Sequence, residues 1–369
     1  MLRSQLLQRV RESGPIPFEE FMRVALYDPE GGYFATGPLR STREGDFLTS
    51  PEVSRLFGET IARFVASEGE RIEADPVDVI EVGAGTGSLL RPLLEGLDRP
   101  ARVVAVEASA AARTSLAERV PEATIVTSLD EVGPVRGVIV ANELIDNLPV
   151  ALAVRRGHEW AERWVGAEGG ELVYVDVPVR PEVAEWCDAH AGPVPEGGRV
   201  EVQLAAGEWL RSAARILEGG SILLVDYGDT GEGLERRRAE GTLRTYRGHH
   251  LGPDPLLEPG ATDITVDVDV GALVAVARSC DLDVELTTQA EFLEAWGLGE
   301  RLRALRQEEL ELARGSDAMA RLEVRSAWSE GQTLLHPRGL GDFRALTVRR
   351  PNRTGEGSDK VGHPLPSGA

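Results

Sequence analysis

The stretch that decides the fold is Val77–Gly87, which reads VDVIEVGAGTG. Its first half is dominated by valine and isoleucine, a pattern typical of a buried strand in a parallel sheet. Glycines at 83, 85 and 87 follow at once, and without a Cβ atom they let the backbone turn tightly and lie close to a ligand. The stretch therefore predicts a strand, a ligand-binding turn and a helix, although a tight turn without any ligand would use the same glycines.

Further apolar runs extend this unit into a sheet. They are predicted strands, at residues 102–107, 123–126, 137–141, 221–227, 282–287 and 343–348. The segments between the first runs have the apolar character that the helices of parallel βαβ units require. The sequence therefore predicts an α/β fold with a seven-stranded, mostly parallel sheet. Asp267 and Asp269 alternate along another short run, which we interpret as an edge strand carrying solvated charges.

The segments around these strands suggest a division of the chain. In order, they are a helical N-terminal cap at 1–75, the first half of the core at 76–150, an insertion at 151–205, the second half of the core at 206–350, and a tail at 351–369. The cap includes a helix that opens at Ser50, with Ser50 as its N-cap. The second half includes a loop at 228–262 that is too long to be a mere connection. The tail is rich in Gly, Pro and Ser and is expected to be disordered.

Composition excludes several classes of protein. The 369 residues include 40 Lys and Arg against 61 Asp and Glu, a formal charge of −21, which argues against a nucleic-acid binder because phosphates repel an anionic surface. Two cysteines and a histidine pair, His249-His250, make neither a metal site nor a disulfide framework. No apolar run reaches the ~18 residues of a membrane helix, and no signal peptide is evident. We expect a soluble, cytoplasmic protein.

The glycine turn and the following strands point to a nucleoside-containing cofactor. Ser88 stands where the NAD fingerprint has its last glycine, and a GxGxG turn preceded by Glu81 resembles motif I of class I S-adenosylmethionine-dependent methyltransferases. Glu107 ends the second strand, where a carboxylate can accept hydrogen bonds from both hydroxyls of an adenosine ribose. Because NAD has the same ribose, Glu107 does not separate the two cofactors. Asp130 fits an acid beside the adenine amine, or equally a helix N-cap.

A second group of polar residues follows the fourth strand. Residues 142–149 read NELIDNLP and place Asn142, Glu143 and Asp146 at the carboxyl end of the sheet, where ligands of open α/β folds bind. Two carboxylates and an amide suit a cationic nitrogen, such as the guanidinium of arginine, which must be oriented for methylation. The alternative is structural, with Asp146 capping a helix and Asn142 fixing the loop.

Together these motifs resemble the MidA-like methyltransferases, a family whose mitochondrial members are complex I assembly factors. The resemblance covers nearly all of residues 8–350. It rests on the order of several segments, at 14–18, 27–33, 45–54, 142–149, 225–228, 241–243, 254–255, 263–265, 288–293 and 341–343. Three positions depart from the common family pattern: Leu144-Ile145 replace an aromatic pair, Asp267 replaces a histidine and His250 replaces an arginine. These departures bear on the acceptor rather than on the cofactor.

The resemblance implies a Rossmann-like class I methyltransferase fold with a helical N-terminal cap and an insertion, and S-adenosylmethionine as methyl donor. It implies catalytic roles for Asn142, Glu143 and Asp146. The residues expected to contact the cofactor are Glu81, Gly83, Gly85, Gly87, Glu107, Asp130, Thr49 and Ser50. Residues 28–54 are expected to form a lid over the cofactor, with flexible joints at Gly31-Gly32 and Gly45-Asp46.

The leading functional hypothesis is a protein arginine methyltransferase. For the mitochondrial relatives, the resemblance implies symmetric dimethylation of an arginine in a respiratory complex I subunit, so the expected partner is a protein with an exposed arginine. A small-molecule O- or N-methyltransferase and a noncatalytic S-adenosylmethionine-binding assembly factor are the alternatives. The last of these would keep the glycine turn but would not need Glu143 and Asp146. A dehydrogenase is disfavoured by Ser88 and by the lack of an evident hydride-transfer site.

Overall fold

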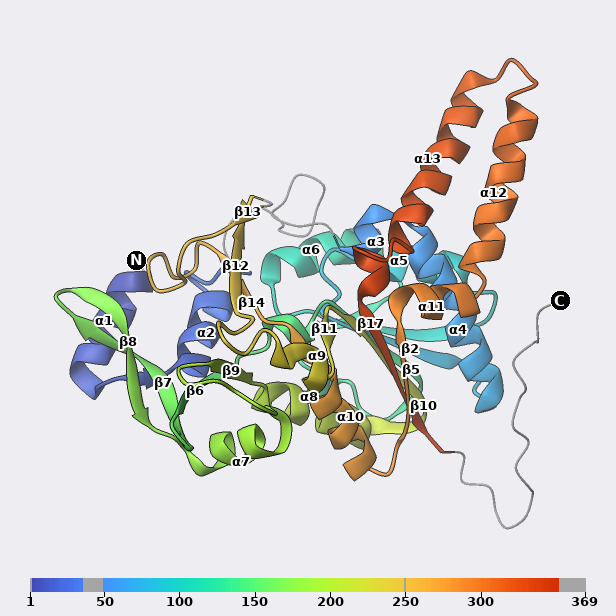
Figure 1. Cartoon of the computed structure of the whole chain (residues 1–369). Coiled ribbons are helices and arrows are strands. Elements are labelled where there is room, and N and C mark those ends of the chain that lie inside the picture. The colour runs from blue at the N-terminus through green and yellow to red at the C-terminus, as the bar shows by residue number, and fades with distance from the viewer. Residues whose placement is uncertain (1, 36–48, 249, 352–369) are drawn as a thin grey trace, which may run out of the picture.

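The computed structural model describes residues 2–35, 49–248 and 250–351, and it has two lobes, each built around its own sheet (Figure 1). The larger lobe contains a seven-stranded sheet in the order β16-β17-β10-β5-β2-β3-β4. Its strands are β2 (Val77–Val82), β3 (Ala101–Val106), β4 (Thr124–Val126), β5 (Val135–Asn142), β10 (Leu217–Asp226), β16 (Asp283–Thr288) and β17 (Arg344–Arg350). The predicted α/β class and the mostly parallel sheet are confirmed. Only β17 reverses the direction, because it pairs antiparallel with β10 on one side and with β16 on the other.

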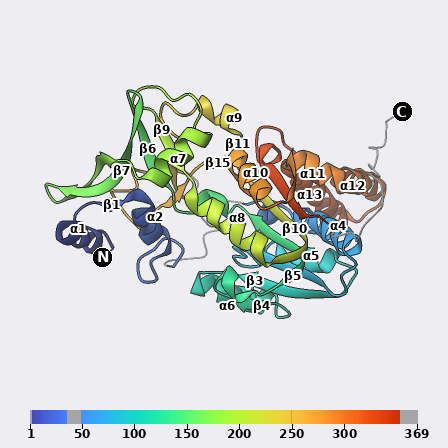
Figure 2. The same ribbon diagram turned by 90° about the horizontal axis from the view of Figure 1, so that it is seen from below.

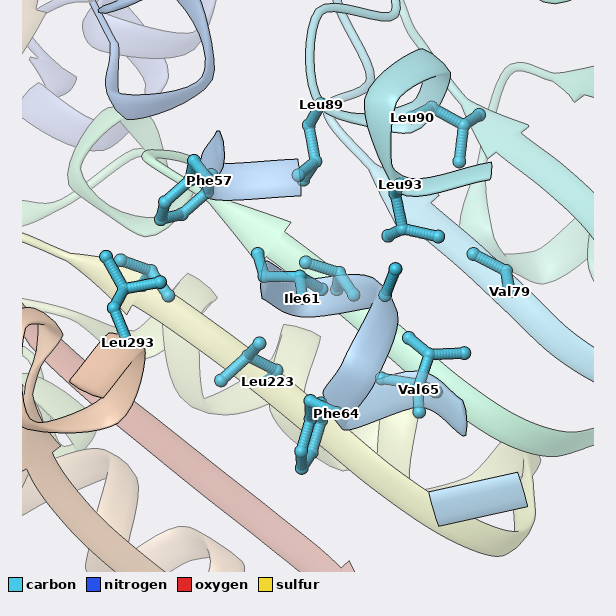
Figure 3. Packing of buried hydrophobic residues seen from close by; sticks show 14 of the residues in the cluster. Phe57, Ile61, Phe64, Val65, Val79, Leu89, Leu90, Leu93, Leu223 and Leu293 are labelled. Carbon is cyan, nitrogen blue, oxygen red and sulfur yellow. The ribbon is translucent and has the colours of Figure 1, made fainter. Parts of the chain in front are cut away.

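Side chains alternate between the two faces of this sheet, and each face has its own helices. One face packs against α4 (Leu56–Arg71) and α5 (Leu90–Gly96), which contribute residues such as Ile61 and Leu93 (Figure 3). The other face packs against α8 (Leu204–Ile216) and α10 (Val270–Ser279). The alternation follows from the strand period of two, so the valine- and isoleucine-rich strands supply both cores at once. Further elements of this lobe are α6 (Ala110–Arg119), η1 (Leu129–Glu131), α11 (Gln289–Ala295) and η3 (Leu340–Asp342).

The smaller lobe is formed by the insertion together with the N-terminal helices. Its sheet contains β1 (Ile16–Pro17), β6 (Ala151–Arg156), β7 (Glu159–Glu168), β8 (Glu171–Pro178) and β9 (Arg199–Val202). Helix α7 (Pro181–His190) packs on one face, and α1 (Leu2–Ser13) and α2 (Phe18–Tyr27) pack on the other (Figure 2). The core of this lobe includes Phe18 and Phe21 of α2 and Leu152 of β6, so it joins two segments that are far apart in sequence.

The residues expected to form one helical cap, 1–75, are divided between the lobes. Helices α1 and α2 belong to the smaller lobe, whereas α4 covers the large sheet. The single helix predicted from Ser50 is in fact two, α3 (Ser50–Val53) and α4, because Ser54 between them is extended. The N-cap is Thr49, and Ser50 is the first helical residue. Of the lid expected at 28–54, residues 36–48 lie outside the described residues, as does the tail beyond 351.

The long loop predicted at 228–262 contains short elements that cover the carboxyl edge of the large sheet. They are β11 (Gly228–Asp229), α9 (Gly231–Glu235), β12 (Arg244–Arg247) and β13 (His250–Leu251), and β14 (Asp263–Thr265) and β15 (Val268–Asp269) follow. The interpretation of Asp267 and Asp269 as solvated edge charges is wrong: both are buried. Each is paired with arginine side chains of the segment before it. Beyond this edge a two-helix arm, α12 (Leu298–Leu312) and α13 (Ala318–Leu334), projects from the lobe (Figure 1).

Candidate active site

The glycine turn follows β2 directly, as the sequence predicts. Gly83, Gly85 and Gly87 have φ angles of 75°, 52° and 79°, in the left-handed region that glycine adopts without steric cost. A side chain on Gly83 would also meet Leu144, since a Cβ atom there would lie 3.0 Å from Leu144 Cδ1. The turn after β2 therefore packs on the polar loop after β5, so the two motifs singled out in the sequence form one site.

Two acids border the glycine turn. Glu107, half-buried at the end of β3, accepts the Gly85 N–H at 2.8 Å with Oε2 and the Ser109 N–H at 2.6 Å with Oε1. Each oxygen keeps a further lone pair for a ligand hydroxyl. Glu81 is buried, and its Oε2 has no hydrogen-bond partner among the described residues. Burial raises the pKa of both carboxyls, and the charge of Glu107 raises that of Glu81 further.

The remaining predicted cofactor residues lie in three different settings. Asp130 is exposed in η1, whose N-cap is Ser128, so the alternative interpretation of Asp130 as the N-cap is wrong. Thr49 is buried at the start of α3. Ser50 is fully buried and donates its backbone N–H to Glu143 Oε1 at 3.1 Å. Its hydroxyl bonds to Gln289 at 2.9 Å. Ser50 thus contacts a predicted catalytic residue, whereas Asp130 makes no contact of this kind in the described part of the chain.

Glu143 has a backbone conformation that is rare for a residue with a side chain. Its φ angle is 48°, in the left-handed region, and its N–H donates to Val225 O at 2.8 Å across the sheet. The side chain of Asn142 donates to Glu143 Oε1 at 3.2 Å, and Asn142 Oδ1 is buried without a described partner. Such strained positions persist only where the surroundings hold them, and they cluster at functional sites.

Asp146 lies in η2 (Ile145–Asn147) and is buried. Its Oδ2 accepts the hydroxyl of Tyr227 at 2.5 Å, whereas its Oδ1 is buried with no partner in the described ranges. The turn itself is capped by Asp226, whose Oδ2 accepts the N–H groups of Ile145 at 2.9 Å and of Asp146 at 3.2 Å. The structural alternative is therefore wrong for Asp146, because Asp226 caps this turn and one oxygen of Asp146 remains available. Its other part agrees with the bond from Asn142 to Glu143.

Crowding of acids dominates the electrostatics of the site. Burial, and then the charge of Asp146, raises the pKa of Glu143 to about 8. Burial also raises the pKa of Asp146 to about 6, against the hydrogen bond from Tyr227, which lowers it. The pKa of Asp226 is raised well above its usual range by burial and by Asp146 and Glu143. A desolvated group of carboxyls favours a bound cation, because a positive charge within a few ångströms restores their ionised forms.

Sequence reasoning missed several residues that build this site. Tyr227 and Asp226 stood in a family motif without an assigned role, as did Gln289, which holds Ser50. Tyr27, at the end of α2, donates its hydroxyl to Asn147 O at 3.1 Å and thereby brings the smaller lobe to the site. The available signal was an acid and a tyrosine as the last two residues of the strand predicted at 221–227, since strand ends of a parallel sheet share one edge.

Comparison with known proteins identifies the family. Residues 60–288 match the family described as "Putative S-adenosyl-L-methionine-dependent methyltransferase". The chain belongs to this family of methyltransferases. It is 30% identical over 324 residues to the protein arginine methyltransferase NDUFAF7 homolog, mitochondrial, of Drosophila melanogaster, covering 75% of this chain and 70% of that protein. It is 27% identical over 350 residues to the Xenopus tropicalis protein arginine methyltransferase NDUFAF7, mitochondrial, covering 85% and 79%.

A solved structure agrees with this assignment over nearly the whole chain. A protein from Burkholderia thailandensis, with S-adenosyl-homocysteine bound, is similar with a TM-score of 0.81 and 29% identity, covering 95% of this chain and 92% of that one. As a member of the methyltransferase family, the chain uses S-adenosylmethionine as its cofactor. The residues present fit that group, because a left-handed glycine turn, a carboxylate with spare lone pairs and Glu81 Oε2, which has no partner in the described chain, lie at the ends of the neighbouring strands β2 and β3.

Neither a metal site nor a membrane-spanning helix is found in the described residues. Within residues 2–35, 49–248 and 250–351, no group of three or more His, Cys, Asp or Glu side chains is arranged to hold a metal ion. In the same part of the chain, no helix has the length and apolar character needed to cross a membrane.

Proposed function

We propose that the protein transfers methyl groups to an arginine side chain of a protein substrate, as a symmetric-dimethylarginine-type enzyme. The observation that carries the proposal is the buried pair Glu143 and Asp146, with Asp146 Oδ1 unpartnered in the described chain, beside the glycine turn. Guanidinium is planar, carries several N–H donors and stays charged at all working pH values, so it suits two converging carboxylates. The names of the mitochondrial relatives, protein arginine methyltransferases, support the same acceptor.

The chain's residues would divide the work in a simple way. S-adenosylmethionine, when bound, supplies an electrophilic methyl group on a positively charged sulfur. Glu107 would accept the ribose hydroxyls, and the glycine turn would allow close approach of the ligand. Asp146 and Glu143 would orient the guanidinium so that one nitrogen lone pair faces the methyl group. Tyr227 holds Asp146 in place, and Ser50 and Asn142 hold Glu143.

Methylation of a guanidinium nitrogen releases one proton, because the product remains a monocation. Glu143 is suited to accept it, because the bound guanidinium would hold this carboxylate ionised and burial raises its pKa to about 8 in the free chain. An ordinary exposed glutamate, with a pKa near ~4.3, would be a much weaker base. Orientation and proton acceptance would thus come from the same buried carboxylate.

Radiolabelled S-adenosylmethionine, incubated with the purified protein and a cell lysate, tests the proposal. The expected result is a labelled protein band whose acid hydrolysate contains labelled dimethylarginine. Label in a small molecule and in no protein would contradict it. A matched reaction with Asp146→Asn should lose the label, which shows that the transfer depends on this site rather than on a contaminant.

A further inference from the structure

Two arginines lie together next to the acceptor residues. Arg237 and Arg244, from the long segment over the carboxyl edge of the sheet, both donate to the buried Asp267. Arg244 Nη1 lies 2.9 Å from Asp267 Oδ1, and Arg237 Nη1 bonds to the other carboxylate oxygen. One carboxylate thus fixes two guanidinium groups side by side.

Backbone bonds fix this pair beside the acceptor site. The N–H of Val266 donates to Asp146 O at 3.1 Å, and the N–H of Val268 donates to Tyr227 O at 3.1 Å. Asp267 lies between these two valines, so the residue that anchors the arginines belongs to the strip of chain that lines Asp146 and Tyr227. The charge of Asp267 accordingly contributes to the raised pKa of Asp146.

The pair carries more positive charge than its anchor neutralises. The Asp267 side chain is 2% exposed, whereas those of Arg237 and Arg244 are 45% and 38% exposed. Two guanidinium groups on one carboxylate leave a net charge of about +1 at the surface. Each guanidinium has five N–H donors, and Asp267 is the only acceptor that the described residues offer to either. A fixed, half-exposed guanidinium fork is the group that binds carboxylates in bidentate fashion.

We propose that Arg237 and Arg244 form an anion subsite that binds an acidic side chain near the methylated arginine of the acceptor protein. The inference rests on the proposed function, because it places the acceptor arginine at Glu143 and Asp146. The preferred substrate is then an arginine with a glutamate or aspartate close by in sequence. The acceptor's arginine would face Glu143 and Asp146, and its acidic side chain would face Arg237 and Arg244. This charge complementarity gives specificity as well as attraction.

A matched peptide series tests the subsite by binding rather than by turnover. The peptides have blocked ends and one arginine, with a single glutamate at successive positions on either side. A second series has glutamine in place of glutamate. Titration calorimetry with the full chain and S-adenosyl-homocysteine should show at least one glutamate peptide bound about tenfold or more tightly than its glutamine partner, the scale of a charge-assisted bond. Methyl transfer to the same peptides is measured separately.

Single variants assign the preference to the pair. Arg237→Gln and Arg244→Gln each leave one arginine to neutralise Asp267, so both should fold, and each should reduce the glutamate preference to about twofold or less. Arg244→Lys should retain part of it. Arg247→Gln is the matched control, because Arg247 lies on β12 but pairs with Glu258, and it should keep the preference.

The outcomes separate the subsite from the proposed function. Equal binding of glutamate and glutamine peptides, binding of none, or a preference that survives in both Arg→Gln variants would overturn the subsite. A glutamate peptide that binds with the expected preference but is not methylated would leave the subsite standing and would count against the proposed function instead.

Discussion

Glu143 is the most informative single residue in the site, because its backbone is left-handed. A glutamate gains nothing locally from a φ of 48°, so other contacts must impose it. Those contacts come from Ser50, Asn142 and Val225, which belong to three separate segments. The fold therefore holds Glu143 in a strained backbone conformation just after β5, where substrate would meet its carboxylate. Close by, Asp146 Oδ1 has no partner in the described chain.

Neutralising either acid should separate catalysis from cofactor binding. Asp146→Asn preserves shape, and Glu143→Gln does likewise, but each removes one negative charge that would orient the acceptor. We expect methyl transfer to fall by ~100-fold or more, the scale that follows when a reactant is misplaced. Calorimetry should show nearly unchanged affinity for S-adenosylmethionine. Loss of cofactor binding in both variants, or full activity on an arginine-containing acceptor, would make these acids structural.

The raised pKa of Glu143 also predicts how stability depends on pH. Between ~4.3, the ordinary glutamate value, and about 8, the folded chain holds a proton that the unfolded chain releases. Wild-type stability should therefore fall as pH rises through this range, and Glu143→Gln should lack this part of the fall. Thermal unfolding should show the variant gaining roughly 2–5 °C over wild type at pH 9 and little at pH 4. An equal gain at both pH values would argue against a buried, protonated Glu143.

At the scale of elements, the sequence predicted those parts of the fold that are encoded locally. Each predicted strand of the large sheet is present. Runs of branched apolar residues indicate the buried central strands, whereas the edge strands β4 and β16 are more exposed. The division of residues 1–75 between two lobes was not predictable in this way. It depends on the packing of α2 against β6 and β7, which are far from α2 in the sequence and leave no periodic signal there.

In the candidate site, too, locally encoded features could be predicted and those set by long-range contacts could not. Its glycines and the acids after β5 could be found from motif and strand position, since both occur at strand ends. The capping of η2 by Asp226 could not, because it requires the register that sets Val225 beside Asn142. The burial of Asp267 was also missed, because alternating acids in a short strand give no indication of arginines that fold over them.

The glycine turn supplies a prediction that concerns cofactor choice. Replacing Gly85 by valine places a branched side chain at a φ of 52°, where it is strained, and fills space beside Glu107. We expect the variant to lose S-adenosylmethionine binding in calorimetry, and we expect wild type to show no binding of NAD. Binding of S-adenosylmethionine that is unchanged in the variant would show that the ligand lies elsewhere.

At the scale of the whole molecule, the two lobes have separate hydrophobic cores. Phe18 in α2 and Phe64 in α4 are both fully buried, but they belong to different cores. Replacing either by alanine should cost about 3–5 kcal/mol. Hydrogen exchange should accelerate mainly in the smaller lobe for Phe18→Ala and mainly in the larger lobe for Phe64→Ala. Acceleration throughout the chain in both variants would mean that the lobes unfold as one unit.

The antiparallel strand β17 has a consequence for how the protein is made. It lies between β10 and β16, yet it leaves the ribosome after every other strand of the large sheet. Until it emerges, the nascent chain presents an unpaired edge on β10 and a β16 without its neighbour, and such edges can pair with other chains. The strands beside the glycine turn, β2, β3 and β5, can already be paired by then. The part of the sheet beside the glycine turn is thus complete early in translation. The nascent chain stays prone to aggregation until β17 pairs with β10 and β16.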